Sequence, residues 1–138
     1  MGGSAPSPWK FCLSRNDVSL RDHFERCWPW LAAALARFDG THTKEDLWQS
    51  IADGTAHLWP LERSAMVTTI ETYPTGLKQI HGWLAGGDLK EIVEYVPTIE
   101  KWAKECCGCS EVVIVGRKGW LKAFEGYKDA GTIMRKAI

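Results

Sequence analysis

A chain of 138 residues, of which 45% are hydrophobic and 25% charged, fits one domain with its own core, and this composition excludes a disordered protein. Its 17 Lys and Arg residues balance 17 Asp and Glu residues, so the formal net charge is zero. Nucleic-acid-binding proteins normally carry a basic excess, and the apolar stretches are far shorter than the roughly 20 residues that cross a bilayer, so we expect neither partner.

The N-terminal residues 1–8 are rich in Gly, Ser and Pro and lack the pattern of a signal peptide. We therefore expect a flexible arm on a cytoplasmic protein, followed by a single domain over residues 9–138. The alternation of Trp9, Phe11 and Leu13 with other residues predicts a short first strand.

Two helices are expected next. Ser19 or Asn16 can cap the first, and Pro29 is expected to start a new helical piece because proline has no N–H to donate inside a helix. Thr43 opens the second helix, and Asp46 three residues later completes an approximate capping box.

Three strands follow, over residues 56–60, 64–72 and 77–84. The segment Tyr73-Pro74-Thr75-Gly76 has the composition of a turn, so these strands should form an antiparallel meander. A long amphipathic helix then begins after Asp88 and ends at Gly108, with a kink or restart at Pro97.

After the long helix we expect a strand buried on both faces, a short helix and a last strand, at residues 111–115, 120–125 and 131–138. A meander followed by a βαβ crossover predicts an α+β fold. Its sheet should be mixed, largely antiparallel and flanked by helices.

This order of elements resembles the GNAT superfamily of N-acetyltransferases. Two local patterns carry the resemblance: strand, glycine-containing turn, long helix and apolar strand across residues 77–115, and a short helix followed by Gly126-Tyr127. More narrowly, residues 83–89 and 116–120 look like a branch found in tailed phages. The resemblance implies the GNAT-like fold, acetyl-CoA as the cofactor of any enzyme, and a phage origin.

The GNAT motif Arg/Gln-x-x-Gly-x-Gly/Ala holds the diphosphate of coenzyme A on backbone N–H groups at a helix N-terminus. Here the motif starts at Trp83, and Gly86 matches, but Asp88 stands where Gly or Ala is expected. Its carboxylate should occupy these N–H groups and repel a diphosphate, so we predict a degenerate site. The cofactor-binding residues that the resemblance implies are Leu84, Gly86 and Gly87.

Arg117 and Lys118 follow the expected parallel strand, at the sheet edge where α/β folds place ligands. They are candidates for binding the phosphates of the cofactor or an acidic partner. The alternative is a solvated basic turn, which we consider the commoner situation.

Many GNAT enzymes protonate the leaving thiolate with a Tyr four residues before the Gly-aromatic pair, and the matching residue here is Lys122. Family members often use a Glu near the middle strands as general base. Glu71 and His81 are the catalytic candidates. We expect structural roles for His57 and His81, with a cleft shared by the two side chains as the alternative.

Cys106 and Cys109 have the spacing of metal ligands, but a structural zinc site needs four ligands and no second pair exists. We therefore expect packing at a helix end, with metal and redox chemistry as the alternatives, and no metal cofactor. Of the 8 Trp residues, three flank the expected acceptor cleft and favour a protein-binding surface there. They are Trp30, Trp48 and Trp59.

Two functions remain open. The first, which we favour, is a non-catalytic binding, virion-associated or assembly component with a protein partner or a second copy of itself, in a phage particle or the host cytoplasm. The second is an acetyl-CoA-dependent N-acetyltransferase in which Arg117 and Lys118 take over phosphate binding.

Overall fold

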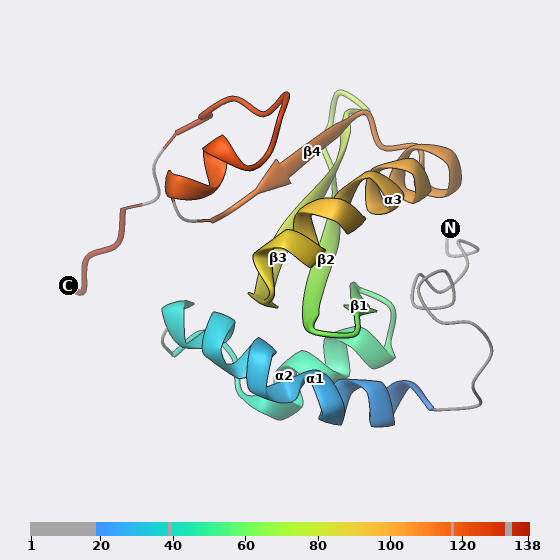
Figure 1. Ribbon diagram of the computed structural model, residues 1–138. Helices are drawn as coiled ribbons and strands as arrows, with labels where there is room; N and C mark the ends of the chain where they lie inside the picture. The colour runs from blue at the N-terminus through green and yellow to red at the C-terminus, as the bar shows by residue number, and fades with distance from the viewer. Residues whose placement is uncertain (1–18, 39, 117, 132–133) are drawn as a thin grey trace.

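The computed structural model describes residues 19–38, 40–116, 118–131 and 134–138. The expected arm over residues 1–8 and the expected strand at Trp9 to Leu13 lie outside them. Figure 1 shows one sheet between two layers of helix, with α1 and α2 on one face and α3 on the other.

The sheet has the order β1-β2-β3-β4. Its strands are β1 (Ala56–Pro60), β2 (Ser64–Thr72), β3 (Lys78–Gly87) and β4 (Glu111–Ile114). The first three pair antiparallel, and β3 pairs parallel with β4 through the crossover helix. The predicted mixed sheet with one crossover is therefore confirmed, although β3 is three residues longer than expected at its carboxyl end.

Helix α1 (Leu20–Leu35) begins at Ser19, whose hydroxyl accepts the N–H of Asp22 at 3.1 Å. The helix runs through Pro29 without a break, so the expected restart there is wrong. Its stripe of apolar side chains, which includes Phe24 and Leu31, is fully buried under the sheet. This burial outweighs the one hydrogen bond that the exposed proline removes.

Two short helical elements follow, η2 (Ala36–Phe38) and α2 (Lys44–Ala52). Helix α2 begins with the predicted capping box. The Thr43 hydroxyl accepts the Asp46 N–H at 3.1 Å, and the Asp46 carboxylate accepts the Thr43 N–H at 2.9 Å. The polar pattern at this helix start was therefore correctly interpreted.

Helix α3 (Leu89–Cys107) is capped by Asp88 and ends at Gly108, which adopts the left-handed conformation with φ 75°. Both ends were predicted, but the helix continues through Pro97 without restarting. Its buried stripe packs against β2 and β3 and is formed by Ile92, Val96, Ile99, Trp102 and Ala103. No helix within the described residues is both long and apolar enough to span a bilayer.

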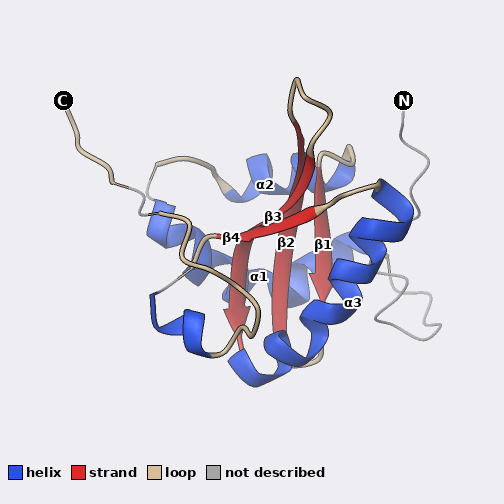
Figure 2. Cartoon of the chain, turned by 90° about the horizontal axis from the view of Figure 1, so that it is seen from above, coloured by secondary structure: helices blue, strands red, loops and turns tan. Residues whose placement is uncertain are grey.

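Figure 2 shows the helices on the two faces of the sheet from above, and a hydrophobic core lies on each of these faces. Alternate residues along a strand belong to different cores, so Leu58 packs toward α1 while Trp59 packs toward α3. Strand β4 is only half-buried because it lies at the edge of the sheet, and the expectation of a strand buried on both faces is wrong.

The C-terminal part of the chain differs most from expectation. The short helix is η3 (Lys118–Lys122), a 3-10 turn that begins and ends earlier than residues 120–125. The predicted last strand is not formed by residues 131 and 134–138, and residues 132–133 lie outside the described part. Met134 and Ile138 are 88% and 116% exposed, so no burial stabilises a strand there.

Candidate functional site

The site is organised by an irregularity in β3. Val67 pairs with Leu84 but the next residue, Thr68, pairs with Gly82, so Trp83 is an extra residue in the ladder. Strand β4 follows β3 only as far as the pair Gly82 and Ile114. Beyond this point, β2 is the one described strand that still pairs with β3. Strands β3 and β4 therefore separate at the bulge.

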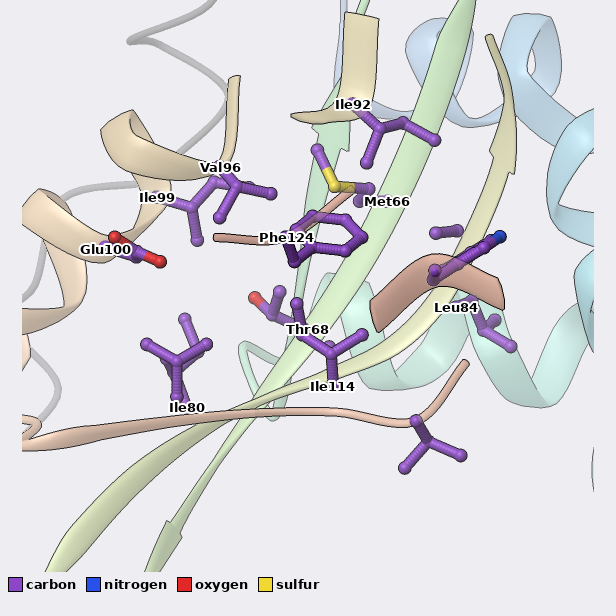
Figure 3. Close-up of a pocket in the computed structure, with 15 residues that line it drawn as sticks. Met66, Thr68, Ile80, Leu84, Ile92, Val96, Ile99, Glu100, Ile114 and Phe124 are labelled. Carbon is purple, nitrogen blue, oxygen red and sulfur yellow. The ribbon is translucent and has the colours of Figure 1, made fainter. Parts of the chain in front are cut away.

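An apolar slot lies beside this separation, on the face of the sheet covered by α3. It encloses a cavity of about 40 Å³, which has room for roughly three water molecules. Figure 3 shows the ring of Phe124 among the side chains of α3 and the strands. The slot-lining residues include Met66, Thr68, Ile80, Ile92, Val96, Glu100 and Trp120.

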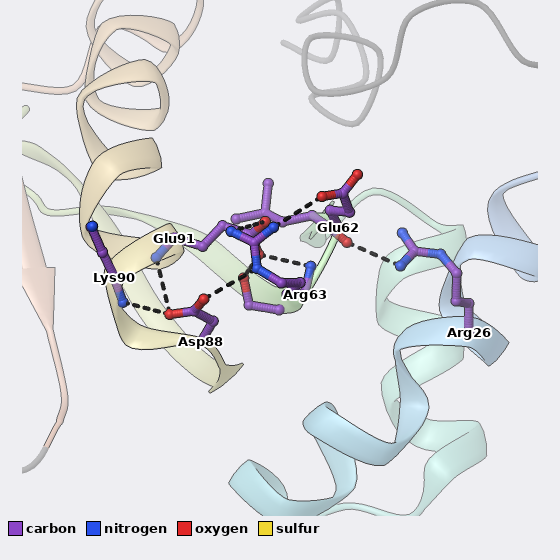
Figure 4. A network of polar contacts seen from close by, with 8 residues as sticks. Arg26, Glu62, Arg63, Asp88, Lys90 and Glu91 are labelled. Carbon is purple, nitrogen blue, oxygen red and sulfur yellow. Dashed lines mark hydrogen bonds and ion pairs between the residues drawn. The ribbon is translucent and has the colours of Figure 1, made fainter.

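The N-terminus of α3 lies at the end of β3, where a diphosphate would bind in the motif described above. The Asp88 carboxylate occupies it. One carboxylate oxygen accepts the N–H of Lys90 at 3.0 Å and the N–H of Glu91 at 3.4 Å (Figure 4). Two of the first N–H groups of the helix are therefore already paired within the chain.

Arg63, in the turn between β1 and β2, holds this carboxylate in place. Its Nε donates to the second oxygen of Asp88 at 3.2 Å, and its guanidinium lies 3.6 Å from Glu91 (Figure 4). The hydrogen bond from Arg63 and those from the α3 backbone lower the pKa of Asp88. Glu91 in turn accepts the N–H of Arg63 at 2.9 Å and a short hydrogen bond from Ser64.

The glycines of the motif are packed closely against the rest of the chain, and their role in cofactor binding stays a prediction. Gly86 and Gly87 lie inside β3 and pair with β2. A Cβ on Gly86 would lie 2.4 Å from the carbonyl oxygen of Trp30, and one on Gly87 would lie 2.5 Å from that of Arg63. These glycines thus allow close packing of the chain on itself. Leu84, the third predicted cofactor residue, is 2% exposed and belongs to the core under α1.

The other predicted phosphate ligands cannot be placed. Arg117 lies outside the described residues, and of Lys118 only the backbone, which begins η3, is described. Their role in phosphate binding stays a prediction.

The two candidate bases lie on the sheet face opposite the slot. Ile70 and Ile80 pack toward α3, so the residues that follow them, Glu71 and His81, face the other way. Glu71 is exposed and pairs in register with Gln79, two residues from His81. The structure thus brings these two candidates to neighbouring positions.

A hydrogen-bonded chain orients His81. Gln79 Nε2 donates to Glu111 at 2.7 Å, so Gln79 Oε1 is left to accept from His81 Nε2 at 2.9 Å. With this assignment the His81 proton is on Nε2, and Nδ1 can accept a proton. Gln79 and Glu111 were missed by the sequence analysis because only the strand register reveals their proximity.

His57 does not join this group, so the idea of a cleft shared with His81 is wrong. Its ring lies 5.0 Å from that of Trp102 on the α3 face. Burial lowers the pKa of His57, although a hydrogen bond to the Thr68 backbone opposes this effect. Trp59, fully buried, donates from Nε1 to the Thr68 hydroxyl at 3.0 Å on the same face.

The predicted tryptophan surface is therefore divided by the sheet. Trp59 lies in the α3-side core, whereas Trp30 and Trp48 pack around the core under α1 and α2. A groove of about 230 Å³ on the α1 and α2 side was not predicted. Its wall includes His42, whose ring lies 4.7 Å from the bulge residue Trp83.

No tyrosine takes the position of the proton donor in η3, where Lys122 is exposed. The nearby Tyr127 hydroxyl instead donates to Glu100 of α3 at 2.5 Å. Burial and this carboxylate raise the pKa of Tyr127. The phenol is thus held as a hydrogen-bond donor within the chain.

Cys107 and Cys109, at the end of α3, are consistent with the expected packing role, whereas Cys106 is exposed. Burial raises the pKa of Cys107 to about 11, and burial also raises that of Cys109. High thiol pKa values disfavour the thiolate that metal binding and redox reactions need. Among the described residues no group of three His, Cys, Asp or Glu is placed to hold a metal ion.

Comparison with solved structures places this arrangement in a known fold. Glucosamine-6-phosphate N-acetyltransferase from Arabidopsis thaliana matches with a TM-score of 0.57 at 14% identity, over 88% of this chain and 95% of the other. Ribosomal-protein-alanine N-acetyltransferase from Brucella melitensis biovar Abortus 2308 matches with 0.55 at 16% identity, over 88% and 94%. An acetyltransferase from Trypanosoma brucei matches with 0.52 at 11% identity, over 80% and 94%.

No family model matches the sequence, and no curated protein matches it. The similarity to solved structures supports the resemblance to the GNAT superfamily at the level of the fold, while the phage branch stays a prediction. The α+β architecture of this chain, with its four-stranded mixed sheet flanked by helices, is that of the GNAT N-acetyltransferases.

Proposed function

We propose that this chain is a non-catalytic member of the GNAT fold that acts as a binding or assembly component. The observation that carries the proposal is the Asp88 carboxylate at the N-terminus of α3. It accepts two backbone N–H groups and is ion-paired with Arg63. The two binding elements that the fold offers to a diphosphate, helix N–H groups and a nearby guanidinium, are already used.

A diphosphate could enter only by displacing this carboxylate. Asp88 and Glu91 place two negative charges at the helix start, and both carboxylates lie within ion-pair distance of the one guanidinium of Arg63. A repulsion of about 1 kcal/mol between like charges at surface distances lowers affinity several-fold. The lost cap and ion pair add to that penalty.

The slot beside the diphosphate position is also filled from within. Trp120 and Phe124 line it, and only about 40 Å³ remains. The arm that joins the diphosphate of coenzyme A to its thiol is far larger than this space. The slot therefore lacks preformed space for this arm of the cofactor.

If coenzyme A does not bind, the function that we propose is binding of a macromolecular partner. Cationic side chains lie over half-buried aromatic rings of α1 and α2. Lys44 Nζ is 5.4 Å from the centroid of the Trp28 ring, and Arg21 Cζ is 4.9 Å from that of the Trp48 ring. Aromatic residues and Arg are enriched at protein interfaces. The resemblance of residues 83–89 and 116–120 to phage proteins favours a phage particle or a host protein as the partner.

Thermal unfolding with and without millimolar acetyl-CoA tests the proposal. A ligand at 100 times its dissociation constant stabilises a protein by about 2.7 kcal/mol, which raises the Tm of a domain of this size by several degrees. We expect no shift for the wild type. The double variant D88N/E91Q should gain a shift, because Asn still caps the helix while both charges are removed.

The matched control is Glu94→Gln, which removes an exposed charge from the same helix away from its N-terminus and should not respond. A clear shift of the wild-type protein by acetyl-CoA would contradict the proposal. Acetyl transfer by the wild type to any amine would do the same.

A working N-acetyltransferase is the second candidate, and the orientation of His81 favours it. Its Nδ1 is free to accept a proton on the sheet face beside the bulge, as a general base for an amine requires. Glu71 lies on the same face. If amine acetylation is detected, His81→Ala should reduce kcat by 10²–10⁴-fold, roughly the usual contribution of a general base.

A further inference from the structure

The segment that closes the slot is a small aromatic unit, which we call the flap and define as residues 119–127. Three rings follow one another along it. The centroids of Trp120 and Phe124 are 6.1 Å apart, and those of Phe124 and Tyr127 are 5.6 Å apart. All three pack against the core under α3.

The flap seals the slot by close contact. Phe124 is 6% exposed and, with Trp120, lines the cavity. The Trp120 ring lies against Gly116 so closely that a Cβ there would be 2.5 Å from it. The space that the flap fills is therefore continuous with the apolar slot.

The flap is held to the rest of the chain by few polar contacts. The Tyr127 hydroxyl donates to Glu100, itself a slot-lining residue of α3, at 2.5 Å. Among the described residues, no other side-chain hydrogen bond joins the flap to α3. Its regular structure is the five-residue 3-10 helix η3, of which residues 119–122 belong to the flap. Opening the flap breaks this hydrogen bond and exposes the three packed rings, so only a small fraction of molecules is open at equilibrium.

The lining of the slot selects the class of ligand. The side chains from α3 and the strands are aliphatic apart from Thr68 and Glu100. Thr68 accepts the hydrogen bond of Trp59, and Glu100 accepts that of Tyr127. Both polar side chains are thus already hydrogen-bonded within the chain, and the rest of the lining favours an apolar ligand.

We propose that the flap is a lid latched by Tyr127 and Glu100, and that the slot behind it binds an uncharged aliphatic chain. The chain takes the space of Phe124 and Trp120 when the flap opens. The affinity for such a ligand is reduced by the small fraction of open molecules. This proposal does not depend on whether coenzyme A binds.

Methionine methyl groups offer a direct probe, because the chain contains 3 Met residues. Met66 is 5% exposed and lines the slot, whereas Met134 is 88% exposed and serves as the internal control. With [methyl-¹³C]methionine and 1-decanol as the ligand, we expect the Met66 signal to shift with saturation. The Met134 signal should stay in place.

Two variants release the flap by different means. Tyr127→Phe removes the latch and should lower the apparent Kd for decanol roughly tenfold, since losing a hydrogen bond to a charged group raises the open fraction. Gly116→Ala should also lower the Kd, because the new methyl group displaces Trp120. The matched controls are Tyr73→Phe, in the turn before β3, and Gly119→Ala, where a Cβ meets nothing within 4 Å.

The proposal is overturned if decanol leaves Met66 unshifted in all these proteins, or if it shifts Met134 equally. It is also overturned if both releasing variants bind with the wild-type Kd. Spectra with acetyl-CoA separate the lid proposal from the proposed non-catalytic function. A shift of the Met66 signal by acetyl-CoA would contradict the proposed function, but it would not contradict the lid proposal. Should Tyr127→Phe fail to fold, Gly116→Ala alone decides the outcome.

Discussion

At the scale of single residues, the glycines at the end of β3 were the main signal for a binding site in the sequence. Glycines at this position suggested a backbone that approaches a ligand closely. The structure shows that the close approach is to Trp30 and Ser64 of the same chain. The residue type therefore indicated that small side chains are needed here. The groups that require them, Trp30 of α1 and Ser64 of β2, are known only from the tertiary structure.

Replacing Gly86 by Ala tests this role. The new Cβ would lie 2.4 Å from the Trp30 carbonyl oxygen, so we expect a loss of stability of about 1–3 kcal/mol from overpacking. Urea denaturation gives the free energy of unfolding. Gly82→Ala is the matched control in the same strand, because its Cβ would meet Ile114 at an ordinary 3.5 Å. Equal stability of the two variants would contradict the packing role.

At the scale of elements, local signals at helix ends were reliable. Ser19, Thr43 and Asp88 cap their helices as predicted, since a cap depends on residues only two or three positions away. Signals that compete with tertiary packing were less reliable. Pro29 and Pro97 did not break their helices, because each helix buries an apolar stripe on both sides of its proline.

The capping box of α2 provides a test at this scale. Thr43→Ala removes the hydroxyl that accepts the Asp46 N–H, and we expect the free energy of unfolding to fall by about 1 kcal/mol. Thr98→Ala, at an exposed site within α3, should cause no loss. The capping interpretation is wrong if chemical denaturation shows the same stability for Thr43→Ala and the wild type.

Across the whole molecule, the α3-side core contains a titratable group whose state depends on folding. Burial lowers the pKa of His57 below its ordinary value of 6.5. Below pH 6.5 the unfolded chain therefore binds protons that the folded chain does not, and the free energy of unfolding must fall as the pH falls. His23, whose pKa burial also lowers, acts in the same direction.

The contribution of His57 can be isolated by comparing stability at pH 7.5 and pH 5.5. His57→Gln should lose less stability between these two values than the wild type, because one of the groups that must stay neutral has been removed. Thr98→Ala, which removes no titratable group and lies at an exposed site, should lose as much as the wild type. An unchanged pH dependence in His57→Gln would show that this buried imidazole is not responsible.

The sequence by itself determined the class and order of the elements. Strand alternation, helix caps and turn residues act over a few neighbouring positions, so the meander, the crossover helix and the acidic cap at Asp88 were accessible without coordinates. The expected last strand was wrong because a strand also needs a partner and a buried face, which residues 131 and 134–138 lack.

Tertiary structure alone decided what surrounds the candidate site. The partner of Asp88 is Arg63, 25 positions away, and the partner of Tyr127 is Glu100, 27 positions away. The bulge at Trp83 and the pairing of Gln79 with Glu111 likewise depend on strand register. Such contacts join distant parts of the chain, and their identity follows from how whole elements bury their apolar faces, which no local pattern specifies.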